Sequence, residues 1–151
     1  MKFTLAHFSD PHLGPLPPSA AWQDFKLKRL IGALSWRIKR QRRYLGVLAN
    51  QVRDDILLQR PDHIALTGDI VNVAALGAFA PAGQWLRSVG DAKLVTFVPG
   101  NHDCYVAVPY ALGLSHFEDY MTGDMKLQAD LQICGGTTAF PFVRLRRNIA
   151  L

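Results

Sequence analysis

Cysteines and long hydrophobic runs are both scarce in this sequence. The 151-residue chain has only two cysteines, Cys104 and Cys134, and they form neither a Cys-x-x-Cys pair nor a zinc-binding pattern. We therefore expect two reduced thiols and no structural disulfide or zinc site. No apolar run is long enough to span a bilayer. The N-terminal apolar stretch is short and interrupted by polar residues, and no small-residue cleavage site follows it. These absences predict a cytoplasmic protein.

Charged residues are also few, at 19% of the chain, while hydrophobic residues make up 49%. This composition excludes a disordered chain and supplies enough apolar side chains for a core. The length fits one domain better than two. We therefore treat residues 1–151 as part of a single domain.

Acidic residues are missing from the segment between Phe25 and Arg43, which contains eight lysines and arginines. Because the whole chain has a net charge of +5, the rest of the chain is net negative. Residues 26–43 fit three descriptions: a solvated helix face, a basic helix on anionic lipid, or a surface that contacts nucleic acid. Lipid is favoured over nucleic acid as a partner, and it would place the protein at the inner membrane face.

Three short apolar segments rich in β-formers predict buried strands, namely Lys2–Ser9, His63–Thr67 and Lys93–Val98. Between the first two, apolar residues recur at helical spacing from Leu27 to Ile56. We expect this helical stretch to be divided at Gly32 and Gly46 and to end before Pro61. Further helices are expected over Phe79–Val89 and Pro109–Met121. The alternation predicts an α/β protein built from parallel βαβ units with right-handed crossovers.

Polar residues that can bind a metal follow each of the three predicted strands. Asp10 and His12 follow the first strand, Asp69 follows the second, and Asn101, His102 and Asp103 follow the third. Ligands of parallel α/β sheets gather at the carboxyl ends of the strands, so these side chains should converge. Oxygen and imidazole donors suit Mn²⁺, Fe²⁺ or Zn²⁺. The pattern therefore predicts a metal site at this edge of the sheet.

Each motif taken alone has an ordinary structural explanation. A Gly-Asp pair such as Gly68-Asp69 ends many strands as a simple turn. Asp10 could cap the segment that follows it, and Asn101-His102 could form a left-handed turn. Their joint occurrence, each directly after a predicted strand, favours the metal site.

Asp10-x-His12, Gly68-Asp69 and Gly100-Asn101-His102-Asp103 resemble the first three blocks of the calcineurin-like metallophosphoesterase superfamily. The residues that flank the second and third blocks are similar to its bacterial cyclic-nucleotide-phosphodiesterase-like branch. The resemblance implies a four-layer αββα sandwich, of which this chain would supply mainly the N-terminal βαβαβ half. It also implies a phosphoester hydrolase, and we expect a phosphodiesterase. Two divalent metal ions (Mn, Fe or Zn) and a metal-bridging hydroxide would carry the reaction.

The resemblance also implies a role for each motif residue. Asp10 and His12 would bind the first metal, Asp69 would bridge both metals, and Asn101 would bind the second. His102 corresponds to the catalytic histidine that assists the leaving oxygen. Asp103 would orient the imidazole of His102.

The sequence departs from the family after His102. The family pattern continues with further histidine ligands, but the only later histidine here is His116, inside a predicted helix. His7 and His63 are expected to be packing or surface residues. We expect the chain to stop within a domain, in a strand that has barely begun near Leu151. Alone it would be weakly active or inactive. The alternative is a non-catalytic fragment or binding module that acts through residues 26–43.

Overall fold

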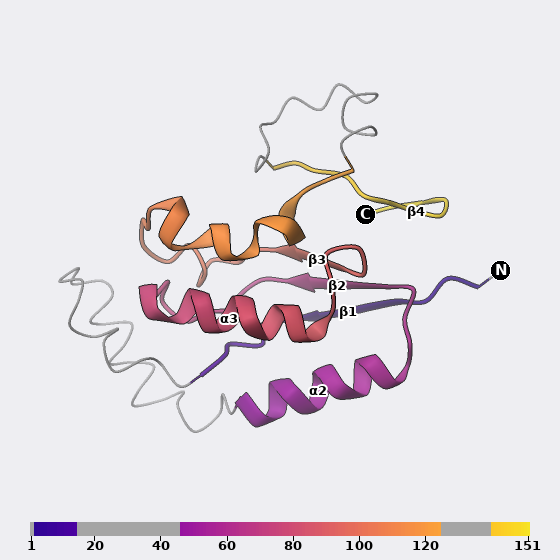
Figure 1. Ribbon diagram of the computed structural model, residues 1–151, viewed down its shortest axis with the longest axis horizontal. Helices are drawn as coiled ribbons and strands as arrows, with labels where there is room; N and C mark the ends of the chain where they lie inside the picture. Colours follow the sequence, from indigo (N-terminus) through magenta and orange to yellow (C-terminus); the bar gives the residue numbers. More distant parts are fainter. Residues whose placement is uncertain (1, 15–45, 125–139) are drawn as a thin grey trace.

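The structure is a computed structural model that describes residues 2–14, 46–124 and 140–151. The described elements follow the order β1 (Leu5–Ser9), α2 (Gly46–Leu58), β2 (His63–Thr67), α3 (Leu76–Val89), β3 (Val95–Val98), η3 (Tyr110–Leu112), η4 (Leu114–Met121), β4 (Leu145–Arg146) and β5 (Ile149–Ala150) (Figure 1). The predicted α/β class and the βαβαβ order are confirmed. The basic segment 26–43 and the helix expected before Gly46 lie outside the described residues.

The central sheet is parallel, with the strand order β1-β2-β3. Its register aligns two apolar rows on one face, Ala6–Ile64–Val95 and Phe8–Leu66–Phe97. The side chains of β2 and β3 in these rows are fully buried, while those of β1 are half-buried. Because β2 lies between the other two strands, its carboxyl end is the centre of the edge where the motif residues emerge.

Helices α2 and α3 lie side by side, as two right-handed crossovers in the same direction require (Figure 1). The indole N–H of Trp85 on α3 donates to Asn50 Oδ1 on α2 at 2.9 Å, and the Trp85 ring packs edge-on against Phe8. Helix α3 begins three residues before the predicted Phe79. The segment that precedes Phe79 contains Leu76 and Ala78, and both residue types favour helix.

The helix predicted over Pro109–Met121 is wrong in detail, because the chain forms two 3-10 segments, η3 and η4, separated by Gly113. Gly113 has φ −127° and ψ −103°, which no helix accommodates. A Cβ at this position would lie 3.0 Å from Val108 Cγ1. The break still lets η4 bury Phe117, whose ring packs 5.1 Å from that of Phe97.

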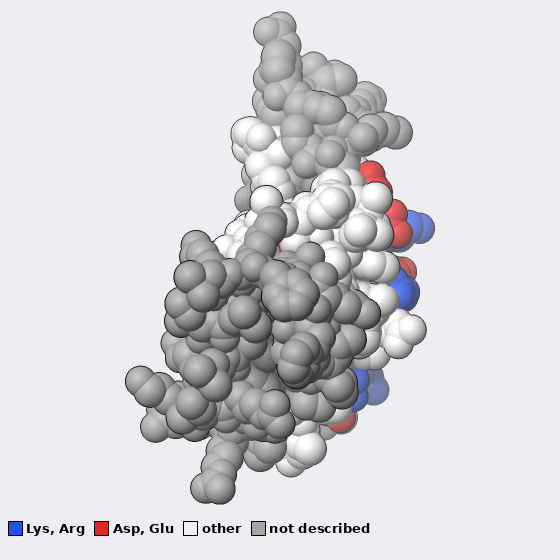
Figure 2. Space-filling model, turned by 90° about the vertical axis from the view of Figure 1, so that its left-hand side faces the viewer, with Lys and Arg blue, Asp and Glu red and all other residues white. Residues whose placement is uncertain are grey.

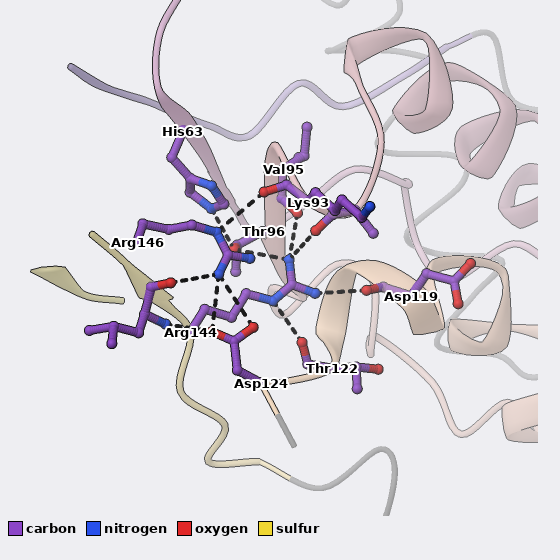
Figure 3. Close-up of polar contacts among 11 residues, drawn as sticks. His63, Lys93, Val95, Thr96, Asp119, Thr122, Asp124, Arg144 and Arg146 are labelled. Atoms are coloured by element: carbon purple, nitrogen blue, oxygen red, sulfur yellow. Dashed lines mark hydrogen bonds and ion pairs between the residues drawn. The ribbon is translucent and has the colours of Figure 1, made fainter. Parts of the chain in front are cut away.

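A buried arginine attaches the C-terminal segment to the sheet (Figure 3). Arg144 is 3% exposed. Its guanidinium donates hydrogen bonds to Thr96 Oγ1. It also donates to four backbone carbonyl oxygens, those of Ala92, Val95, Asp119 and Thr122. Among the described residues, no carboxylate is hydrogen-bonded to it. Burial and the neighbouring Arg146 lower the pKa of Arg144, and the five acceptors offset the cost of desolvating the cation.

The last described residues turn back on themselves. β4 and β5 form an antiparallel hairpin with Leu145 opposite Ala150 and Arg146 opposite Ile149. Arg147 has a left-handed backbone, φ 57°, at the turn. The single strand expected near Leu151 is therefore two very short strands that pair with each other.

The described surface carries charges of both signs. On the face shown in Figure 2, lysines and arginines alternate with aspartates and glutamates along one edge of the described residues. Of the helices in the described part of the chain, none is long and apolar enough to cross a membrane.

Replacing Arg144 by methionine should lower the free energy of unfolding by about 3 kcal/mol, because the buried Val95 carbonyl and three part-buried carbonyl oxygens lose their donor. Arg147 is the matched control, since its partner Asp62 lies at the exposed rim of the sheet. Arg147→Met should cost less than about 1 kcal/mol. Urea unfolding of both variants measures the difference. Equal losses in the free energy of unfolding would contradict the stabilising role of the Arg144 hydrogen bonds.

His63 adds a pH dependence to the same cluster. It is fully buried, and its Nε2 lies 2.8 Å from Thr96 Oγ1. Because Thr96 Oγ1 accepts a bond from Arg144, its hydroxyl hydrogen is available to donate to the imidazole. Burial, Arg146 and Arg144 lower the pKa of His63 to about 4. The folded state therefore favours the neutral ring.

Between pH 6.5 and 4 the unfolded chain binds a proton at His63 that the folded chain excludes. Stability from this group is complete above pH 6.5 and is lost as the pH falls toward 4, by about 3 kcal/mol. His63→Leu should make the free energy of unfolding less dependent on pH. Unfolding in urea at pH 7 and pH 4.5 compares the variant with wild type. Identical slopes would show that His63 does not contribute.

Candidate metal centre

The strand-end loops of β1 and β2 continue to pair beyond the sheet. The backbone N–H groups of Asp10, His12 and Leu13 donate to the carbonyls of Gly68, Asp69 and Ile70, at 3.3, 3.0 and 3.0 Å. The two loops therefore run side by side past the last strand residues. This pairing brings Asp10 and His12 next to Asp69.

Asp10, His12 and Asp69 each present a ligand atom to a common point. One atom from each lies within 4.8 Å of the others. The Nε2 of His12 is 3.9 Å from Asp10 Oδ1 and 3.8 Å from Asp69 Oδ2. His12 and Asp69 are buried, whereas the side chain of Asp10 is 56% exposed. Two carboxylates and one imidazole on an open rim fit a divalent cation with oxygen and nitrogen ligands.

The loop after β3 packs against the loop after β2 at a glycine. A Cβ on Gly100 would lie 2.7 Å from Gly68 Cα and 2.7 Å from Asp69 N, and it would overlap Asp69 Oδ1. No other residue fits this approach. The contact allows the His102 N–H to donate to Asp69 Oδ1 at 2.8 Å, which leaves Oδ2 of the same carboxylate facing His12.

Strained backbone is concentrated around these loops. Asp10, His12 and Asp69 have φ of 55°, 42° and 50°, which aspartate and histidine tolerate better than most residues. Val73 and Ala74 also have positive φ, 51° and 49°. A β-branched valine in this region is a true outlier and costs on the order of 1–3 kcal/mol. A local hydrogen bond offsets part of this strain, since the Ala74 N–H donates to the His102 carbonyl at 2.9 Å.

Asn72 positions His12, although it belongs to none of the three sequence motifs. Its Oδ1 lies 3.1 Å from His12 Nδ1, and its amide donates to the Leu13 carbonyl at 3.1 Å. An oxygen acceptor at Nδ1 favours the tautomer with hydrogen there, so Nε2 keeps its lone pair toward Asp10 and Asp69. The sequence signal was a single polar residue within the apolar run Ile70–Ala75, and the structure buries it fully.

The protonation state of His12 also favours metal binding. Burial lowers the pKa of its imidazole, and nearby His102 lowers it further, while the carboxylates of Asp69 and Asp10 oppose the shift. The net direction is downward. A metal binds the neutral ring, so a lowered pKa keeps the ligand competent toward more acidic solution.

Asp103 contacts different groups from those expected. Its two oxygens accept the backbone N–H groups of Val71 and Gly100, each at 2.8 Å. His102 Nδ1 is buried and has no hydrogen-bond partner among the described residues. The expected orienting bond from Asp103 to the imidazole is therefore absent from this geometry. Asp103 instead ties the turn after β3 to the segment after Asp69. Burial raises its pKa to about 6.

The other candidate residues lie around the cluster. Asn101 is exposed on the same turn as His102, and its role as a ligand of a second metal stays a prediction. His116 lies on η4, where its carbonyl and Cβ face Gly83 of α3. His7 contacts Thr67 on the sheet surface. Cys104 is an exposed free thiol, and partial desolvation together with the carboxylates of Asp103 and Asp69 raises its pKa.

Comparison with protein families agrees with this geometry. A family model described as calcineurin-like phosphoesterase matches residues 3–141. The chain therefore belongs to the calcineurin-like phosphoesterase family, whose members use divalent metals in hydrolysing phosphoesters. Comparison with curated proteins and with solved structures gave no significant match.

Removing the Asn72 side chain should weaken metal binding. Asn72→Ala removes the oxygen acceptor at His12 Nδ1 that favours the metal-binding tautomer. Losses of this kind lower metal affinity about 10- to 100-fold. Mn²⁺ titration by calorimetry measures the change. Asn50→Ala on α2 serves as a control, because Asn50 accepts a hydrogen bond from Trp85 at the helix surface and is not part of the Asp10–His12–Asp69 cluster. Unchanged Mn²⁺ affinity in folded Asn72→Ala would rule out the positioning role.

Proposed function

We propose that this chain is a phosphodiester hydrolase whose divalent cation is held by Asp10, His12 and Asp69. The observation that carries the proposal is the convergence of these three ligand atoms within 4.8 Å at the carboxyl ends of adjacent parallel strands. Asn101, on the neighbouring turn, is proposed as a ligand of a second cation. The flanking sequences Ala65–Asp69 and Val98–Asp103 support a place in the cyclic-nucleotide-phosphodiesterase-like branch.

A bound divalent cation would polarise a phosphoryl oxygen and lower the pKa of water. The chain's own residues prepare the site for it. Asp69 offers one oxygen to the site while the other is fixed by the His102 N–H. His12 is held by Asn72 with Nε2 directed inward. His102 lies next to His12, with ring centroids 5.1 Å apart, and is proposed to donate a proton to the leaving oxygen.

The competing proposal is a non-catalytic module that keeps the ligand set as scaffold. The basic residues 26–43 would then bind an anionic partner. The strained backbone at Asp10, His12 and Asp69 favours the enzyme, because strain of this kind collects at functional sites. We therefore place the catalytic proposal first.

Hydrolysis of a nitrophenyl phosphodiester with added Mn²⁺, and again with chelator, tests the proposal. We expect slow, metal-dependent turnover, because the chain has no histidine after His116 to complete the ligand shells. Asp69→Asn should lower both Mn²⁺ affinity and turnover by at least about tenfold, because the amide lacks the negative charge that attracts the cation. Asp62→Asn, at the opposite end of β2, should change neither.

Three outcomes would contradict this expectation. Turnover that survives chelator would exclude a metal-dependent reaction. Mn²⁺ binding that Asp69→Asn leaves unchanged would place the cation elsewhere. A folded chain that binds Mn²⁺ through Asp69 without any turnover would favour the non-catalytic module.

A further inference from the structure

His102 has a fixed backbone but lacks the usual partner for its ring. Its N–H donates to Asp69 Oδ1 at 2.8 Å, and its carbonyl accepts the Ala74 N–H at 2.9 Å. Its Nδ1 has no partner among the described residues. Asp103, the adjacent carboxylate, is fully engaged by backbone N–H groups. The orientation of the imidazole must therefore come from packing.

Two rings supply that packing. Tyr105 stacks on His102 with ring centroids 5.8 Å apart and planes inclined by 17°. His12 meets the same imidazole edge-on, at 5.1 Å and 90°. Both distances fall in the range in which aromatic rings attract each other beyond simple burial. The imidazole is thus held between a parallel face and a perpendicular one.

Tyr105 is itself anchored. It is partly buried and packs against the hydrophobic core. It also follows His102 by three residues on the same turn, a turn that is closed by the bond from Cys104 N–H to the Gly100 carbonyl at 3.3 Å. The stacked Tyr105 ring is therefore held in place by the core and by the closed turn.

We propose that Tyr105 is the positioning residue for His102, and that its ring face does the work that a carboxylate would do through a hydrogen bond. The inference rests on the proposed function, in which His102 serves the leaving oxygen. Tyr105 orients the imidazole against His12, so that the proton carried by His102 is held beside the metal-binding residues. The interaction needs the ring and not the hydroxyl group.

The kinetic test uses the full chain with Mn²⁺ and compares two phosphodiester substrates, one with a nitrophenolate and one with an alkoxide leaving group. Nitrophenolate leaves without protonation, whereas an alkyl alkoxide needs a proton from the enzyme. Tyr105→Ala should lower kcat for the alkyl substrate about three- to tenfold and change the nitrophenyl reaction much less. KM should be unchanged for both. Tyr105→Phe should restore the alkyl rate, because it retains the stacked face.

A second measurement does not depend on turnover. The chain has five histidines, and ¹³C-labelled histidine rings give resolved resonances that His102→Gln assigns by the loss of one set. In the metal-free chain, the His102 ring protons should keep their ring-current shift in Tyr105→Phe and lose it in Tyr105→Ala.

The two measurements distinguish a failure of the proposed hydrolase function from a failure of the positioning role of Tyr105. Absence of metal-dependent turnover in every variant would overturn the proposed hydrolase, and the histidine spectra would still decide the stacking. Spectra in which Tyr105→Ala leaves the His102 resonances in place would overturn the positioning role. Equal losses of kcat for both substrates would also overturn it, because they would indicate a general structural effect.

Discussion

Asp69 occupies the point where three loops of the chain meet, and the site depends on how closely those loops approach. One carboxylate oxygen accepts the His102 N–H, and the other faces His12. The backbone carbonyl of Asp69 also accepts the His12 N–H. This arrangement is possible only because Gly100 has no side chain, since a Cβ would overlap the Asp69 carboxylate. A single aspartate therefore links the loop of β1, by its main chain, to the loop of β3, by its side chain.

The buried polar groups around Asp69 are paired in a consistent pattern. Asn72 bonds His12, Asp103 bonds two backbone N–H groups, and Ala74 bonds the His102 carbonyl. These bonds help to stabilise the left-handed conformations at Val73 and Ala74, because each satisfies a group that would otherwise be buried without a partner. Pairing thus both rigidifies the loops and fixes the tautomer of His12. His102 is the exception, since its ring is held by aromatic contacts.

Stability at the other end of the sheet has a different source. Arg144 joins β3, η4 and the C-terminal hairpin through carbonyl oxygens, and His63 and Thr96 extend the cluster into β2 (Figure 3). This cluster lies toward the amino end of β2, where His63 begins the strand, whereas the candidate metal ligands lie at its carboxyl end. Variants at Arg144 should therefore change unfolding more than chemistry, and variants at Asn72 or Tyr105 should do the reverse.

The sequence alone was sufficient for the three parallel strands, the βαβαβ order and the placement of Asp10, His12 and Asp69 at one edge. Short apolar runs and strand-end motifs are local signals, and parallel pairing then dictates convergence. It could not reveal the break at Gly113, the hairpin after Arg144, or the partners of Asp103 and Asn72. Those depend on which groups of distant segments come within bonding distance once the core has packed. The convergence of Asp10, His12 and Asp69 as candidate metal ligands was thus determined by the sequence. The contacts around His12 and His102 were decided by the tertiary structure, because hydrogen-bond partners and ring stacking are set by packing and not by spacing along the chain.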